Sequence, residues 1–476
     1  MMHKPISIKD LGLSFPHKIC FENFTTQIHF GSRIAIIGQN GCGKSTVLKI
    51  LQGMFESTSG SINIPNDVKF GYVPQVIEVF DSLSGGQRLN KAISAALAKN
   101  PNVLLLDEPT NHLDSKNRKS LMRMLAGYQG TLIVVSHDKE LLRNCSDTLW
   151  HIIDGQVQVF SGSYDDYRRE ANIKRAAIEQ KLSQLASQKK DMHRVLMKEQ
   201  HRASKSKAKG QKSINQRKWP TVVSKAKANR AAQTTGGRKA AIEQKRQNLV
   251  EQLSSLQAPE VIVPKFSISA SQIRDCTLVS THNGTVRYCN QAPMLRDITF
   301  SISSRDRIAI NGDNGSGKST LIKAIVGNPN VVKDGDWHTP NTQDIGYLDQ
   351  HYATLPPEST VLESIHDLVP SWSHAQVRRH LNDFLFRKNE EIEASVKQLS
   401  GGEKARLSLA QIAACTPKLL ILDEVTNNLD LETRQHMIEV LRNYPAALIV
   451  ISHDEDFLRE IGINQVYTLR NGTNLT

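Results

Sequence analysis

One nine-residue pattern occurs twice in this chain, and it restricts the possible folds more than any other feature. Residues 38–46 read GQNGCGKST and residues 312–320 read GDNGSGKST, so both match G-x-x-x-x-G-K-[ST]. The apolar run at 33–37, before the first copy, is typical of a parallel strand buried on both faces. A repeat of this kind predicts two similar α/β domains.

The repeated loops are expected to hold nucleotide phosphates. Their glycines let successive backbone N–H groups surround phosphate oxygens at the start of the next helix. The lysine of each loop can reach the β- and γ-phosphates, and the serine after it can bind Mg²⁺. A glycine-rich turn that matches by chance is the alternative, which the strand–loop–helix context disfavours. The predicted phosphate-binding residues are Gly38, Asn40, Gly41, Gly43, Lys44, Ser45 and Thr46 in the first half, and Gly312, Asn314, Gly315, Gly317, Lys318, Ser319 and Thr320 in the second.

A strand that ends in two acids follows each loop. Four aliphatic residues lead into Asp107 and Glu108, and the second half repeats this at Asp423 and Glu424. An acid at the C-terminal end of a parallel strand, beside a phosphate loop, is placed to hold Mg²⁺ directly or through water. The glutamate after it is suited to orient or deprotonate the attacking water.

A histidine follows the next strand in each half, at His137 and His453. A lone histidine is usually structural, but these two would lie at the sheet edge that carries the loop and the acids. We therefore expect them to sense the γ-phosphate.

Two further features recur in each half. A Ser-Gly-Gly helix start offers free N–H groups and the positive end of a helix dipole, which make a second anion site. An aromatic residue precedes each loop at a similar distance, where its ring can stack on adenine or pack in the core. The residues concerned are Ser84, Gly85, Gly86 and Phe15 in the first half, and Ser400, Gly401, Gly402 and Tyr288 in the second.

The order of these features, with a glutamine between loop and helix start, resembles the ATP-binding-cassette superfamily. The resemblance implies that each ATP lies between the loop of one half and the Ser-Gly-Gly start of the other, within a monomeric chain. It also implies Mg²⁺ and hydrolysis of ATP to ADP and phosphate. The implied catalytic residues are Glu108, His137, Gln75, Glu424, His453 and Gln350, and the implied Mg²⁺ residues are Ser45, Gln75, Asp107, Ser319, Gln350 and Asp423.

The two halves differ in one spacing. His137 and His453 lie 316 residues apart, whereas the two loop lysines lie 274 apart. Nearly all of the difference falls between Gln75 and Ser84, which are 9 residues apart, while the corresponding pair in the second half is 50 apart. The first half has therefore lost most of a helical subdomain, which predicts that the two ATP sites are not equivalent.

The segment between the halves carries the positive charge of the chain. Residues 168–246 contain 23 Lys or Arg and 5 Asp or Glu, whereas the whole chain has a net charge of +13. This density favours nucleic-acid binding through phosphate backbones, and a solvated linker is the alternative. Apolar spacing at 178–196 and 242–256 predicts an antiparallel helical hairpin with its tip at 204–230. Trp219 in the tip can stack on a base or pack against the turn itself.

Composition limits the remaining possibilities. The six cysteines are scattered without metal-ligand spacing, which favours reduced thiols in a cytoplasmic protein. No apolar run approaches the ~18 residues of a membrane span, and residues 1–5 lack a signal-peptide core. We therefore expect no membrane contact.

Two cassettes on one chain, the run Glu-Pro-Thr-Asn-His-Leu-Asp at 108–114 and a basic helical linker resemble the ABC-F family over nearly the full chain. The resemblance implies an α/β protein with two P-loop ABC-type nucleotide-binding domains joined by a basic antiparallel helical hairpin. The expected division is a first ATPase domain at 1–158 with a reduced helical subdomain, a linker at 159–264 and a second ATPase domain at 265–476.

In functional terms the family resemblance implies an ATPase that acts on the ribosome as a translation factor. Its linker would enter the tRNA exit site, contact 23S-type rRNA and tRNA, and point toward the peptidyl-transferase centre. The short first cassette resembles the branch that protects ribosomes from antibiotics. The main alternative is a twin-cassette ATPase subunit of a membrane transporter, which needs no basic arm. A DNA-repair ATPase usually carries zinc-binding cysteine pairs or very long coiled coils, and a non-catalytic RNA-binding scaffold conflicts with two intact sets of carboxylates.

Overall fold

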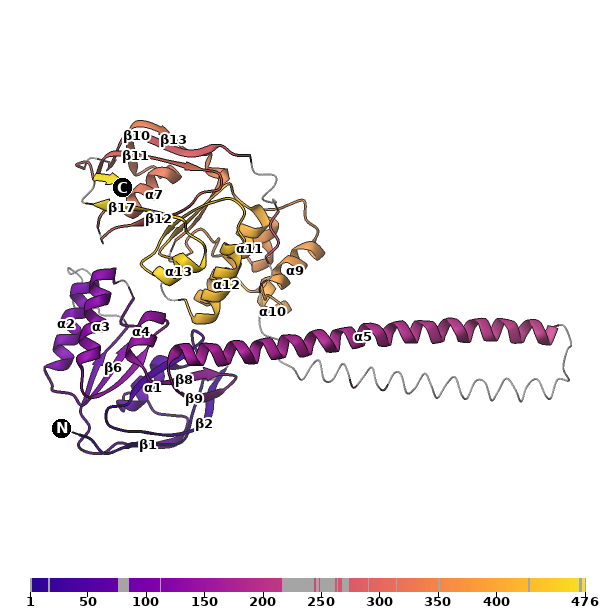
Figure 1. Ribbon diagram of the computed structural model, residues 1–476, viewed down its shortest axis with the longest axis horizontal. Helices are drawn as coiled ribbons and strands as arrows, with labels where there is room; N and C mark the ends of the chain where they lie inside the picture. The colour runs from indigo at the N-terminus through magenta and orange to yellow at the C-terminus, as the bar shows by residue number, and fades with distance from the viewer. Residues whose placement is uncertain are drawn as a thin grey trace. The chain divides into compact units, whose positions relative to one another are not determined.

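Each half of the chain is built around a parallel sheet whose central strands consist almost entirely of buried aliphatic residues (Figure 1). The computed structural model describes residues 2–15, 18–75, 85–111, 113–215, 244, 248, 262, 264–267, 274–289, 291–313, 315–349, 352–426, 429–470 and 473–475. The elements of the first half are β1 (Ile6–Phe15), β2 (Lys18–Ile28), β3 (Arg33–Gly38), α1 (Lys44–Leu51), β4 (Ser59–Asn63), β5 (Phe70–Val73), α2 (Gly85–Leu97), β6 (Val103–Asp107), α3 (Ser115–Gly127), β7 (Thr131–Val135), α4 (Lys139–Cys145), β8 (Thr148–Ile153) and β9 (Gln156–Ser161).

The strand order in the first half brings the predicted catalytic segments to one edge. The six-stranded sheet runs β5-β6-β7-β3-β8-β9, and all neighbours are parallel except β8 and β9. In the register of β6 and β7, Asp107 pairs with Val135, one residue before the loop that leads to His137. The carboxyl ends of these strands and of β3 therefore meet at the same edge. A three-stranded antiparallel sheet, β2-β1-β4, packs its buried residues into the same core.

The second half repeats this plan with a larger helical part. Parallel strands run in the order β17-β12-β16-β15-β14 within a nine-stranded sheet. Its elements are β10 (Thr277–Tyr288), β11 (Leu295–Ser303), β12 (Arg307–Asn311), α7 (Lys318–Val326), β13 (Val331–His338), η3 (Thr342–Asp344), β14 (Ile345–Leu348), α8 (Val361–His366), α9 (His374–Asp383), α10 (Asn389–Glu393), η4 (Val396–Gln398), α11 (Gly401–Cys415), β15 (Leu419–Asp423), α12 (Leu431–Arg442), β16 (Ala447–Ile451), α13 (Glu455–Glu460), β17 (Gln465–Arg470) and β18 (Thr473–Leu475).

The helical subdomain distinguishes the two halves. In the second half α8, α9 and α10 lie between β14 and α11 and share a buried core with them. In the first half β5 ends at Val73 and α2 begins at Gly85, and residues 76–84 lie outside the described residues. Only the second half therefore has enough residues between these elements to form a helical subdomain.

The basic segment begins as one continuous helix, α5 (Tyr164–Asn215), of 52 residues. At 1.5 Å per residue it is about 78 Å long. The predicted second arm lies outside the described residues except for positions 244 and 248, and so do Trp219 and the rest of the tip from 216 to 230.

The chain divides into two compact units, Met1–Asp165 with Val261–Thr476, and Asp166–Glu260. The expected domain boundary at 158 falls within β9, and the three-domain division stays a prediction. Among the helices that the structure describes, none combines the length and apolar composition needed to cross a membrane.

Candidate nucleotide-binding and catalytic sites

Both glycine-rich loops adopt a backbone shape that only glycine fits easily. Gly43 has φ 97°, and a Cβ there would come within 2.7 Å of Leu13 Cδ2. Gly317 repeats this with φ 100° and a Cβ position 2.5 Å from Leu295 Cδ2. These two residues precede α1 and α7, whose first N–H groups have no partner within the helix. Each loop is therefore a narrow cradle that ends at a helix N-terminus, as a phosphate site requires.

The lysine of each loop folds back over its own cradle. Lys44 Nζ donates to the carbonyl oxygens of Gly38 and Gln39 at 2.8 and 2.9 Å. Lys318 Nζ donates in the same way to Gly312 and Asp313 at 2.7 and 3.0 Å. Both lysines are buried, so each ammonium group is held where phosphate oxygens would meet it.

A cavity of about 440 Å³ lies beside the first loop. This volume is within the usual range of small-molecule sites. Phe15 is 42% exposed, so its ring is not part of the core. The cavity brings together ten predicted residues, namely Phe15, Asn40, Gly41, Gly43, Lys44, Ser45, Thr46, Gln75, Glu108 and His137, with Asn111 and Val135 beside them.

The predicted Mg²⁺ oxygens lie close together in both halves. Ser45 Oγ donates to Asp107 Oδ1 at 3.0 Å, and burial raises the pKa of the Asp107 carboxyl. In the second half Ser319 Oγ lies 3.5 Å from Asp423 Oδ1, and Tyr347 donates to the other carboxylate oxygen at 3.4 Å. A hydroxyl beside a carboxylate supplies the hard oxygen donors that Mg²⁺ prefers, so these residues fit that ion.

The glutamate and histidine of the first half form a buried pair. Glu108 has φ 48° and its side chain is 9% exposed, and His137 Nε2 lies 3.5 Å from Glu108 Oε1. Burial raises the pKa of Glu108 to about 8 and lowers the pKa of His137 to about 3. Near pH 7 a protonated carboxyl therefore faces a neutral ring, and the pair is not an ion pair.

The equivalent pair in the second half is looser. His453 Nε2 lies 4.0 Å from Glu424 Oε1, and the Glu424 side chain is 28% exposed. Burial lowers the pKa of His453 to about 4, so this ring is also neutral near pH 7.

Residues of the second half contact the first loop directly. Asp430 Oδ2 accepts the backbone N–H of Asn40 at 3.1 Å, and Glu432 accepts from the Gln39 amide at 2.7 Å. Burial would raise the pKa of Asp430, but the N–H donors of Thr433 and Asn40 outweigh it and lower that pKa. Sequence reasoning gave Asp430 no role. The available signal was that Asp114 and Asp430 follow the two acidic strand ends at the same distance.

Among the residues that the structure describes, Gly85, Gly86, Ser400, Gly401 and Gly402 of the Ser-Gly-Gly segments do not line the first cavity. Ser400 is the N-cap of α11 and forms a capping box, in which its hydroxyl accepts the N–H of Glu403 and the Glu403 carboxylate accepts the N–H of Ser400. Gly402 lies close to Thr433, because a Cβ on it would be 3.0 Å from Thr433 Oγ1. In the first half Gly85 and Gly86 begin α2.

The structure describes some of the remaining predicted residues but not all of them. Tyr288 lies beside the second loop, with its hydroxyl 3.3 Å from Thr320 Oγ1, and its ring packs partly against the core of the second half. Gly315 lies in the second loop with φ 84°. Ser84, Asn314 and Gln350 lie outside the described residues.

Comparison with known proteins relates this chain to ABC ATPases. The family described as ABC transporter matches residues 21–76, 68–111 and 295–427. The ribosome protection protein VmlR of Bacillus subtilis (strain 168) is 29% identical, over 99% of this chain and 88% of that protein. The putative ATP-binding protein YdiF of the same strain is 27% identical, over 96% and 78%. The ATP-binding protein Uup of Escherichia coli (strain K12) is 27% identical, over 95% and 78%. Because the similarities to these three proteins span both halves and the segment between them, the chain is a twin-cassette ABC ATPase that is homologous to ABC-F proteins.

Proposed function

We propose that this protein is an ATP-hydrolysing translation factor that acts on the ribosome, and therefore in the cytoplasm. The observation that carries the proposal is α5, a continuous helix with fourteen Lys or Arg against six Asp or Glu, which follows the first candidate nucleotide site along the chain. A long cationic helix suits the phosphate backbone of RNA. The similarity to a protein named for ribosome protection supports the ribosome as the partner.

In the proposed reaction each site converts ATP and water to ADP and phosphate. Lys44 and the N–H groups of the first loop bind the phosphates, and Phe15 stacks on the adenine. Ser45, Asp107 and Gln75 would hold Mg²⁺, which would neutralise charge on the phosphate oxygens. Glu108 orients the attacking water, and its ionised form, the minor form near pH 7, accepts a proton from that water. Neutral His137 donates a hydrogen bond to the γ-phosphate.

The second site uses the equivalent residues, and each site is closed by the Ser-Gly-Gly segment of the opposite half. Lys318 would bind phosphate, Ser319, Asp423 and Gln350 would hold Mg²⁺, and Glu424 and His453 would take the catalytic roles. Binding of ATP would then draw the two halves together, and hydrolysis would release them.

On the ribosome, we place the linker in the tRNA exit site, with the tip at 204–230 directed toward the peptidyl-transferase centre. It would form a helical hairpin that contacts 23S-type rRNA and tRNA. Protection of the ribosome against antibiotics is the proposed physiological role, because the short first cassette resembles that branch.

Co-sedimentation with ribosomes tests this proposal. The Glu108→Gln, Glu424→Gln double variant should bind ATP without turning it over, and should pellet with 70S ribosomes only when ATP is present. Lys44→Ala with Lys318→Ala is the matched control that cannot bind ATP and should stay in the supernatant. No pelleting of the first variant at moderate salt would contradict the ribosomal role. Binding to membrane vesicles instead would favour the transporter alternative.

A further inference from the structure

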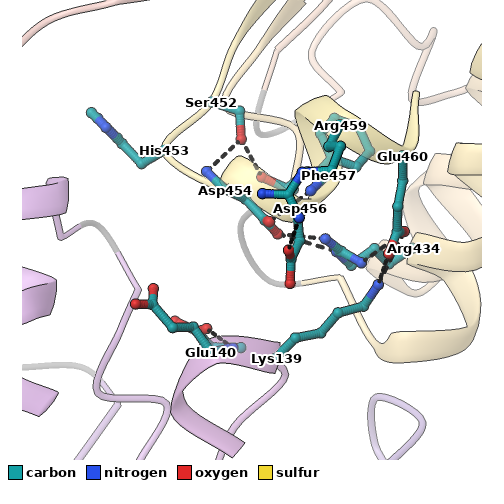
Figure 2. A network of polar contacts seen from close by, with 12 residues as sticks. Lys139, Glu140, Arg434, Ser452, His453, Asp454, Asp456, Phe457, Arg459 and Glu460 are labelled. Atoms are coloured by element: carbon teal, nitrogen blue, oxygen red, sulfur yellow. Dashed lines mark hydrogen bonds and ion pairs between the residues drawn. The ribbon is translucent and has the colours of Figure 1, made fainter. Parts of the chain in front are cut away.

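Ion pairs join the two halves outside the nucleotide sites (Figure 2). On α4 of the first half, Lys139 Nζ lies 2.7 and 3.0 Å from the two carboxylate oxygens of Glu460 on α13 of the second half. One turn further along α4, Arg143 Nη1 lies 2.6 Å from Asp456 Oδ2. The earlier residue of α4 meets the later residue of α13, so the two helices pair in opposite directions. We call these two ion pairs the α4–α13 clasp.

Lys139 is buried, whereas its partner Glu460 is 31% exposed and also lies near a cation of its own half. Lys139 is 6% exposed, and Arg434, at 3% exposed, places Nη1 3.6 Å from the same Glu460 carboxylate. Arg434 Nη2 also lies 2.8 Å from Asp454 Oδ2. Glu460 therefore lies between a cation of its own half and a cation of the other half. A buried ammonium depends strongly on such a partner, because removing the partner leaves a desolvated charge.

Each helix of the clasp continues directly from a catalytic loop. Asp138, the residue after His137, caps α4 by accepting the N–H groups of Glu140 and Leu141. Asp454, the residue after His453, caps α13 by accepting the N–H group of Phe457. A displacement of α4 relative to α13 would therefore shift both histidine loops.

The clasp exists on one side only. With the 316-residue offset between the halves, Glu455 corresponds to Lys139 and Asn144 corresponds to Glu460. A glutamate and an asparagine cannot form the reverse ion pair. Arg459, which corresponds to Arg143, is 76% exposed and lies 3.4 Å from Asp456 of its own helix.

We infer that the α4–α13 clasp sets the affinity for ATP by holding the two halves together on one side, with Lys139 and Arg143 as positioning residues that do not touch the nucleotide. The inference rests on the proposed ATPase, in which both halves contact each ATP. Association of the two halves and ATP binding are then linked. A group that stabilises the association therefore lowers the ATP concentration that is required to fill the sites. Arg143 Nε also donates to Asp165 Oδ1 at 3.0 Å, which brings the first turn of α5 into the same cluster.

Zero-length cross-linking tests this pairing without depending on activity. A carbodiimide should join Lys139 to Glu460 in the full-length Glu108→Gln, Glu424→Gln variant, and mass spectrometry should show at least a threefold higher yield with ATP. Lys397 and Glu358, 3.0 Å apart within the second half, provide an internal control whose yield should not change. The inference is overturned if the control pair cross-links and the 139–460 pair does not, or if its yield is independent of ATP.

A double-variant cycle tests the role in ATP affinity. Glu460→Gln leaves the Lys139 ammonium buried without its carboxylate, so it should raise KM for ATP at least tenfold with kcat changed less than threefold. The double variant Lys139→Met, Glu460→Gln should have a KM for ATP within threefold of the KM of Lys139→Met alone. Such a recovery would also show that the double variant folds. Arg459→Ala is the matched control and should leave KM unchanged. No change in KM for Glu460→Gln, or no recovery in the double variant, would overturn the inference. Wild-type protein without ATPase activity would contradict the proposed function, while the cross-link would still report on the clasp.

Discussion

Glu108 and Glu424 occupy equivalent positions, yet their surroundings differ. Glu108 is 9% exposed and 3.5 Å from its histidine, whereas Glu424 is 28% exposed and 4.0 Å from its histidine. The serine–aspartate distance shows the same trend, at 3.0 Å in the first half and 3.5 Å in the second. The first site is therefore the more closely assembled of the two.

This difference predicts unequal effects of single substitutions. A positioned general base contributes about 10²- to 10⁴-fold to a rate. Glu108→Gln should therefore lower kcat more than Glu424→Gln, because enclosed groups are held closer to a productive geometry. Phosphate release at saturating ATP measures both variants, and a fluorescent ATP analogue should bind each with unchanged Kd. Equal reductions in kcat, or a larger reduction in Glu424→Gln, would contradict the asymmetry.

The first loop should also be sensitive to a single added methyl group. In Gly43→Ala the Cβ would meet Leu13 at 2.7 Å while φ is 97°, so the loop has to deform. Backbone strain of this kind costs about 1–3 kcal/mol. We expect a lower Tm and weaker ATP binding, measured by calorimetry and titration. Gly127→Ala is the control because a Cβ there meets no atom within 4 Å, and identical behaviour of the two variants would refute the prediction.

The helices of the second half are connected through a buried histidine. His380 Nε2 of α9 donates to the Ala410 carbonyl of α11 at 2.8 Å. Its ring packs against Trp372 and Phe384, with centroids 5.0 and 5.1 Å away. Burial lowers the pKa of His380 below its usual value, although the hydrogen bond to Ala410 acts in the opposite direction.

The lowered pKa of His380 predicts that low pH destabilises the packing of these helices. The unfolded chain binds the proton more readily than the folded one, so His380 favours unfolding as pH falls below about 6.5 and has no such effect above it. Tm measured by calorimetry should therefore fall between pH 7.5 and 5.5. The fall should be smaller in His380→Gln but not in a control at exposed His374, His374→Gln. An equal fall in both variants would contradict this role.

At the scale of the whole molecule, the charge is divided between the basic linker and a remainder that is net negative. The described part of the linker presents exposed lysines along one 52-residue helix. If this helix binds RNA backbone, its affinity should depend steeply on salt, because each neutralised phosphate releases counterions.

Replacing exposed lysines of α5 should flatten that dependence. We expect a variant with Gln at Lys181, Lys189, Lys190 and Lys198 to bind ribosomes more weakly. Its plot of log affinity against log salt should be shallower by about 0.7–0.9 for each phosphate that is no longer neutralised. Arg at the same four positions keeps the charge and is the control. An unchanged slope in the Gln variant would show that these lysines do not bind phosphate.

Much of the fold was predictable because the residues that each motif requires lie close together in the sequence. A phosphate loop needs glycine, lysine and serine within nine residues, and the strand before it must be apolar to be buried on both sides. Segments 33–37 and 103–106 accordingly lie within the parallel strands β3 and β6, and the acids follow at the expected edge. The difference between the halves before the Ser-Gly-Gly segments was also visible, because it is a difference in chain length.

The pairing of side chains between the halves was not predictable in this way. Asp430 meets Asn40 across 390 residues, and Lys139 meets Glu460 across 321. No local spacing encodes such pairs, because an aspartate at a helix N-terminus or a lysine at a helix start has many acceptable surroundings. Only the packing of one half against the other determines which buried charge receives which partner, since each desolvated group must find its counterpart in the folded chain.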